Sequence, residues 1–147
     1  MVVQIDNKQS NHRISEKRVR QTAKVILSAL GCPDAELSIL IVDDQQIAKL
    51  NHQYLNHKGP TNVIAFCMRQ GPFPDITPNL LGDVVISADT AYREAQRAGI
   101  SMPNRFDQLL IHGILHLLGF DHEKTEAEAL RMEKRAEELF KEIKAKA

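Results

Sequence analysis

Hydrophobic and polar residues along this chain follow two periods, one typical of strands and one typical of helices. Four runs rich in β-branched and other apolar residues have the length of strands. We place these strands at residues 2–5, 37–43, 62–68 and 82–87. Elsewhere apolar residues recur every three or four positions, as on one face of a helix. These stretches predict helices over about 16–30, 44–58, 88–98, 103–118 and 126–144.

Capping signals support several of these boundaries. Asp43 with Gln46, and Thr125 with Glu128, have the spacing of a capping box at a helix N-terminus. Gly59 and Pro60 together are expected to end the second helix. Candidate N-caps also precede the first and third helices, at Ser15 and at either Ser87 or Asp89.

The order of these elements indicates the fold class. Strands and helices are interspersed, which predicts one domain over residues 1–147, an α+β or α/β sandwich of sheet and helices. Residues 69–81 carry three prolines and show no regular period, so we expect a loop there. The sequence shows no internal repeat and no low-complexity tract.

Composition places the chain among soluble globular proteins. Its 147 residues are 43% hydrophobic and 26% charged, and basic and acidic residues number 19 each. The zero net charge argues against wholesale electrostatic capture of nucleic acid or membrane, although a local basic patch is compatible with it. The first residues, MVVQIDNKQSNHR, lack the charged and apolar regions of a signal peptide, so we expect none, and no apolar run is long enough for a membrane span. Two unpaired cysteines, Cys32 and Cys67, fit reduced thiols, so we expect a cytoplasmic protein.

One apolar segment, HGILHLLGFDH, contains three of the six histidines. His112 and His116 are four residues apart, so on a helix both imidazoles leave the same face. Gly119 suits the left-handed position that ends a helix, and such a turn reverses the chain toward His122. The pattern therefore predicts that His112, His116 and His122 bind one metal ion on a core helix and the turn after it.

The ligand set indicates the kind of metal centre. Three imidazoles leave one position of a tetrahedral zinc ion open, which is typical of catalytic sites. Among first-row ions imidazole suits zinc well, and neutral ligands leave the double charge free to acidify a bound water. We therefore expect one Zn²⁺ ion per chain. The alternative, that one or two of these residues are ordinary core histidines, is weaker for three at this spacing.

Gly113 separates this motif from a well-known class of zinc enzymes. Metzincin proteases share the histidine spacing but carry a glutamate general base directly after the first histidine. Gly113 has no side chain to move a proton, so the site needs either space or a close backbone approach there. Asp121 and Glu123 are the neighbouring carboxylates. We predict a proton-transfer or ligand-orienting role for Asp121, and a solvent-exposed loop position for Glu123.

The chain also resembles a known family, the YbeY endoribonucleases or rRNA maturation factors. HGILHLLGFDH matches every fixed position of that family's H-G-x-L-H-L-x-G-[YF]-D-H motif. Three further stretches resemble the family in the right order. They are LNHQYLNHKGPTNVIAF at 50–66, LLGDVVIS at 80–87, and the acidic segment with Met132 and Glu133.

This resemblance implies properties that composition does not show. It implies an α+β fold around a mixed four-stranded sheet, with zinc held by His112, His116 and His122. It also implies an endoribonuclease that processes ribosomal RNA, notably the 3′ end of the small-subunit RNA, and acts in ribosome quality control. Ribosomal RNA and the ribosome are the implied partners.

The sequence departs from the family at one functional position. The family has an arginine after the aromatic residue of its L-N-x-x-[YF]-R segment, and this chain has Leu55 there. Leucine cannot bind a phosphate or stabilise transition-state charge. We predict that Lys58 and Arg69 contact the substrate, or that another basic residue reaches the site. The further basic residues considered for such a groove are Arg93, Arg97 and Arg105.

The sequence thus favours a zinc-dependent endoribonuclease for single-stranded RNA in rRNA maturation, and it leaves two alternatives open. One is a zinc hydrolase acting on a peptide or another small substrate, against which the missing glutamate at Gly113 counts. The other is a non-enzymatic ribosome-assembly factor with a structural zinc site, which Leu55 favours.

Overall fold

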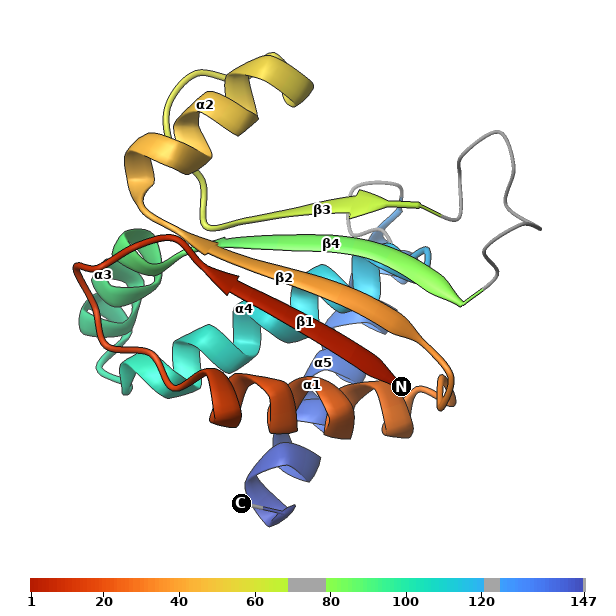
Figure 1. Ribbon diagram of the computed structural model, residues 1–147. Coiled ribbons are helices and arrows are strands. Elements are labelled where there is room, and N and C mark those ends of the chain that lie inside the picture. Colours follow the sequence, from red (N-terminus) through yellow and green to blue (C-terminus); the bar gives the residue numbers. More distant parts are fainter. Residues whose placement is uncertain (69–78, 121–124, 147) are drawn as a thin grey trace.

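A computed structural model describes residues 1–68, 79–120 and 125–146 of the chain. Helices and strands alternate through most of it, as the periodicity predicts (Figure 1). In chain order they are β1 (Val2–Asn7), α1 (Glu16–Ala29), β2 (Glu36–Val42), α2 (Asp44–Leu55), β3 (Val63–Cys67), β4 (Leu80–Ser87), α3 (Ala88–Ala98), α4 (Met102–Leu117) and α5 (Glu126–Lys146).

The four strands form one sheet in the order β1-β2-β4-β3. β1 pairs parallel with β2, and β2 pairs parallel with β4, so each of these pairs is joined by a segment that contains helix. β3 pairs antiparallel with β4, with Val63 opposite Ile86 and Cys67 opposite Gly82. The sheet is therefore mixed, and the expected α+β fold with a mixed four-stranded sheet is confirmed.

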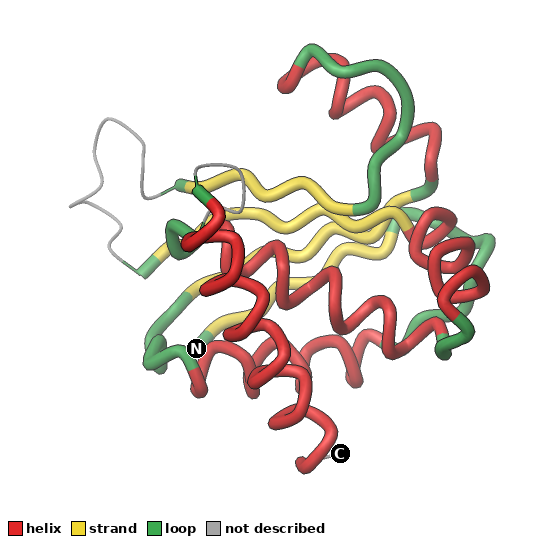
Figure 2. The backbone as a smooth tube through the Cα atoms, turned by 180° about the vertical axis from the view of Figure 1, so that it is seen from behind, coloured by secondary structure: helices red, strands yellow, loops and turns green. Residues whose placement is uncertain are grey.

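Helices cover the two faces of the sheet unequally. Figures 1 and 2 show α1, α4 and α5 together on one face, and α2 on the other. The alternation of side chains along a strand explains this arrangement, because Val84 and Ile86 belong to the large core, whereas Val85 belongs to a small cluster with Ile47 of α2. In the described part of the chain, none of the helices combines the length and hydrophobicity of a membrane span.

Most predicted helix boundaries are confirmed, and one is wrong. The Asp43 side chain accepts a hydrogen bond from the Gln46 N–H, and the Gln46 side chain bonds back to the Asp43 N–H, which completes the capping box. Of the two candidates for α3, Ser87 is the N-cap. However, α2 ends before Gly59 because Asn56 adopts the left-handed conformation with φ of 55°. Asparagine tolerates that conformation better than most residues, so it stops the helix earlier.

Asp44, in the first turn of α2, joins that helix to α3. Its carboxylate accepts hydrogen bonds from Ser87 Oγ at 2.7 Å, Thr90 Oγ1 at 2.6 Å and Arg93 Nη1 at 2.6 Å. Burial alone would raise the pKa of the Asp44 carboxyl, but these three hydrogen bonds and the Arg93 charge lower it by more than burial raises it. The pKa of Asp44 is therefore lowered from its usual value of 3.8. Arg93 is thus engaged in holding two helices together.

Candidate metal centre

Two of the three predicted ligands, His112 and His116, lie on α4, the helix most deeply inserted in the core. Ser101 caps its N-terminus by accepting from the Asn104 N–H, and Pro103 occupies the first turn. Residues such as Leu110, Ile114 and Leu115 are fully buried, so α4 is fixed along most of its length. A helix anchored in this way presents its remaining side chains with little freedom.

Gly113 explains how closely α4 lies against the sheet. A Cβ atom at this position would lie 2.6 Å from Val84 Cγ1 and 3.3 Å from Val63 Cγ2. Both distances are shorter than ordinary packing allows, so only glycine fits while β3 and β4 keep their present places. The predicted close backbone approach is confirmed, and its partner is the sheet.

His112 and His116 project together from the same face of α4, as their spacing predicts. Both are half-buried, their ring centroids are 4.6 Å apart, and their Nε2 atoms are 3.0 Å apart. A tetrahedral zinc ion with Zn–N bonds of about 2.0–2.1 Å separates two imidazole nitrogens by about 3.3 Å. The pair is therefore close to the geometry of two ligands on one ion.

The turn after α4 has the form that the third ligand requires. Gly119 has φ of 95°, its N–H donates to the His116 carbonyl at 3.1 Å, and the Phe120 N–H donates to the Leu115 carbonyl at 3.1 Å. These two bonds make a Schellman motif, which reverses the chain directly before the predicted third ligand.

Four of the predicted or considered site residues lie outside the described residues. They are Arg69, Asp121, His122 and Glu123. Within residues 1–68, 79–120 and 125–146, no group of three metal-ligating side chains is present. The described histidine pair fits zinc in donor type and in spacing, and the third ligand stays a prediction.

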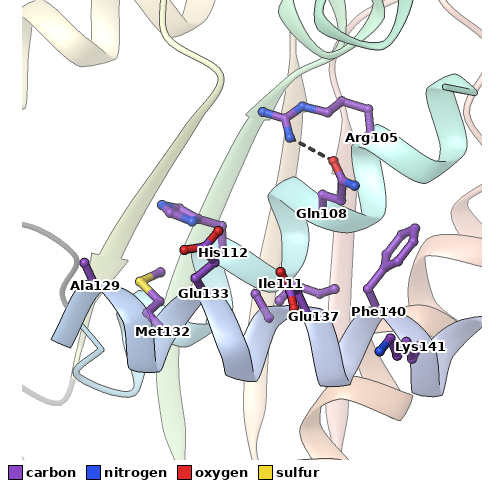
Figure 3. A pocket seen from close by; sticks show the side chains of 11 residues that line it. Arg105, Gln108, Ile111, His112, Ala129, Met132, Glu133, Glu137, Phe140 and Lys141 are labelled. Carbon is purple, nitrogen blue, oxygen red and sulfur yellow. Dashed lines mark hydrogen bonds between the residues drawn. The ribbon is translucent and has the colours of Figure 1, made fainter. Parts of the chain in front are cut away.

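A groove of about 620 Å³ runs between α4 and α5 and reaches the first of the two histidines. Figure 3 shows His112 and Glu133 at one end, with the Glu133 carboxylate pointing toward the imidazole. Arg105 and Gln108 line the same side of the groove further along α4. The α5 side continues with Glu137 and Lys141 among its lining residues.

The structure separates the basic residues that the sequence proposes for substrate contact. Lys58 is exposed in the loop after α2 and does not line the groove. Arg97 is exposed on α3, and Arg69 lies outside the described residues. Leu55, at the end of α2, is 46% exposed. Of the described basic candidates, Arg105 shares the groove with the first histidine.

Sequence reasoning did not identify the groove itself or the part that α5 takes in it. A signal was present, because Arg105, Gln108 and His112 are spaced i, i+3 and i+7 and so share one stripe of α4. The contribution of Glu133 could not be recognised in the same way, since it depends on how α5 packs against α4.

Comparisons with known proteins agree with the sequence motifs. The family described as endoribonuclease YbeY matches residues 4–144. The chain is 52% identical to endoribonuclease YbeY of Geobacter sulfurreducens over 95% of this chain and 94% of that protein. Its identity to endoribonuclease YbeY of Syntrophotalea carbinolica is 49%, over 97% and 96% of the two chains.

One solved structure is also similar. It is the solution structure of TM1509 from Thermotoga maritima, with a TM-score of 0.69 and 18% sequence identity. The match covers 99% of this chain and 91% of that chain, and at this identity it supports the fold alone.

Proposed function

The chain belongs to the family of endoribonuclease YbeY, and from this premise we propose that it is a zinc-dependent endoribonuclease specific for single-stranded RNA. We propose that it acts in the cytoplasm on ribosomal RNA, notably at the 3′ end of the small-subunit RNA, and in ribosome quality control. The family match supports the endoribonuclease activity. The observation that carries the metal dependence is the pair of Nε2 atoms 3.0 Å apart on His112 and His116.

In this proposal His112, His116 and His122 hold the zinc ion. When bound, zinc supplies a Lewis acid and an acidified water for phosphodiester hydrolysis. The chain contributes rigidity, because the buried face of α4 and the close packing at Gly113 fix both described imidazoles. The carboxylate of Glu133 points toward His112, where it is placed to orient the ring (Figure 3). Asp121 remains our candidate for proton transfer.

The test compares two histidine substitutions on the purified protein. We expect His116→Ala to lose zinc and metal-dependent cleavage of a single-stranded RNA with the small-subunit 3′-end sequence, because one ligand is removed. His52→Ala is the matched control, since His52 is exposed on α2 and should leave both properties unchanged. Full metal-dependent cleavage by His116→Ala would contradict the proposal.

Leu55 favours one second function, a ribosome-assembly factor whose zinc site is structural. The residue is exposed where the family carries arginine, so the usual cationic side chain is absent from this position. Comparing cleavage by the wild type and Leu55→Arg separates the two functions. No activity in either form, with ribosome association intact, would favour the assembly role.

A further inference from the structure

The absence of a basic side chain at Leu55 raises the question of which cation contacts the phosphate backbone. Five basic residues were considered from the sequence, and four of them lie in the described part of the chain. Arg93 is bound to Asp44 in the link between α2 and α3. Arg105 alone of these four lines the groove that also contains His112.

The guanidinium of Arg105 is held in a fixed orientation. Its Nε and Nη2 atoms donate to Glu94 Oε1 at 3.1 and 3.0 Å, and its Nη1 atom donates to Gln108 Oε1 at 2.9 Å. These bonds use three of the five guanidinium N–H groups, so one N–H on each terminal nitrogen is left for a ligand. The side chain of Arg105 is 27% exposed, which leaves it accessible from the groove.

Arg105 lies about two turns of α4 before His112. Seven residues separate the two, so their backbone positions are about 10 Å apart along the helix. In Figure 3 the Arg105 side chain extends along α4 toward the end of the groove where His112 lies. A phosphate bound at Arg105 would therefore be displaced along the groove from one bound beside His112.

We propose that Arg105 and Gln108 form a phosphate subsite for single-stranded RNA in the groove between α4 and α5. The subsite binds a backbone phosphate next to the scissile one, through the free guanidinium N–H groups and the Gln108 amide. This inference rests on the proposed function, and it names the path of the strand on one side of the cut. In this proposal the basic side chain that is missing at position 55 of α2 is supplied by Arg105 of α4.

The acidic side chains of the groove refine the proposal. Glu137 is exposed and lines the groove from α5, so its negative charge opposes a phosphate strand lying there. Removing that charge should strengthen RNA binding, which is a change that partial unfolding does not produce. Glu137→Gln is therefore a gain-of-binding variant for the same groove.

The experiment measures binding of a fluorescent, cleavage-resistant single-stranded oligoribonucleotide to the zinc-loaded protein over a series of salt concentrations. We expect Arg105→Gln to weaken binding about tenfold, because one charge-assisted phosphate contact is lost. The slope of log K against log salt should fall by about 0.7 for that contact. Arg97→Gln makes the same charge change on exposed α3 and should alter affinity less than about twofold.

Steady-state cleavage by the zinc-loaded protein gives an independent measurement. Arg105→Gln should raise KM with little change in kcat, because a contact remote from the cut is made equally in the ground state and the transition state. Glu137→Gln should bind RNA more tightly than the wild type. Thermal unfolding of each variant shows whether the Arg105 substitution leaves the fold intact.

The outcomes separate the subsite from the proposed function. Wild-type affinity and salt slope in Arg105→Gln would overturn the subsite, whether or not the RNA is cleaved. Weaker binding by Arg105→Gln together with no cleavage by the wild type would support the subsite and contradict the proposed nuclease. Equal losses in Arg105→Gln and Arg97→Gln, with no gain in Glu137→Gln, would reduce the effect to general charge and also overturn the subsite.

Discussion

At the scale of single residues, Gly113 sets the distance between α4 and the sheet. The residue directly follows His112, so any displacement of the helix at this point moves a predicted ligand. Val84 and Val63, the side chains that a Cβ would meet, belong to different strands. The position of the imidazoles is therefore controlled by packing on the side of the helix next to the histidine face.

We predict that Gly113→Ala destabilises the protein although alanine is the better helix former. Overpacking against Val84 costs about 1–3 kcal/mol, whereas the change from glycine to alanine in a helix gains about 1 kcal/mol. The net loss should be visible in urea unfolding. Zinc affinity should fall as well, because the helix must move away from the sheet.

A second substitution tests this explanation. Val84→Ala removes two of the three methyl groups that the new Cβ would meet, including the nearest one. The double variant should therefore be less destabilised than the sum of the two single variants. Additive effects would show that the contact with Val84 is not the cause.

The roles of single residues were predicted correctly from the sequence where they depend on interactions between neighbours in the chain. The capping box of Asp43 and Gln46 and the Schellman turn at Gly119 involve neighbours in the chain, so the sequence identifies them. The role of Gly113 was recognised as a need for space or for a close backbone approach. Its partner could not be predicted because it depends on the register between β3, β4 and α4.

At the scale of elements, two half-exposed basic side chains around one buried carboxylate connect three helices. Asp107 of α4 is fully buried, and Arg18 of α1 binds it through two contacts of 2.6 and 3.1 Å. Lys144 of α5 lies 3.6 Å from the same carboxylate. The three helices that cover one face of the sheet therefore share one charged junction.

Removing the basic partner of Asp107 while leaving its carboxylate in place should destabilise the folded protein. We predict that Arg18→Met lowers the free energy of unfolding by about 3–5 kcal/mol, because Asp107 then stays buried without its main partner. Replacing both residues, as Arg18→Met with Asp107→Leu, should restore much of that loss. Chemical denaturation of the two variants measures the difference, and a larger loss in the double variant would contradict the explanation.

The link between α2 and α3 gives a prediction about pH. The pKa of Asp44 is lowered in the folded protein, so its stabilising effect is present above the usual pKa near 3.8 and is lost as the pH falls through the folded value. Asp44→Asn should therefore destabilise the protein at pH 7, by about 1–3 kcal/mol for hydrogen bonds to a charged group. Below about pH 4 the wild type and the variant should converge.

Thermal unfolding from pH 7 to pH 3 measures this effect. Asp34→Asn is the matched control, since Asp34 is exposed and the substitution should change stability little at any pH. A constant difference between wild type and Asp44→Asn over the whole range would show that the charge of Asp44 is not responsible.

At the scale of the whole molecule, the proposed zinc site would couple metal binding to folding. The proposed ligands are expected to meet only when α4 and the turn after it are formed, so zinc should bind the native state in preference to the unfolded chain. Chelation should therefore lower the midpoint of thermal unfolding, and zinc at about 1,000 times its Kd should add about 4 kcal/mol. In His116→Ala the effect of the chelator should be absent.

The global architecture was predictable to the level of its fold class. Periodicity located the four strands and five helices found among the described residues, and the family motifs implied the mixed sheet that they form. The hydrophobic periodicity does not predict how α5 packs against α4, and this packing creates the groove beside His112. For the same reason Lys58 was proposed for substrate contact from its place in a motif, whereas the groove is lined by Arg105.

The order of the elements along the chain has a consequence for biosynthesis. All four strands are finished at Ser87, whereas His112 and His116 follow on α4, and the other wall of the groove is α5. A nascent chain made at about 5–20 residues per second therefore has the residues of its whole sheet for some seconds before it has the proposed metal ligands. Until that point in its synthesis, the chain lacks the residues that we propose for RNA cleavage.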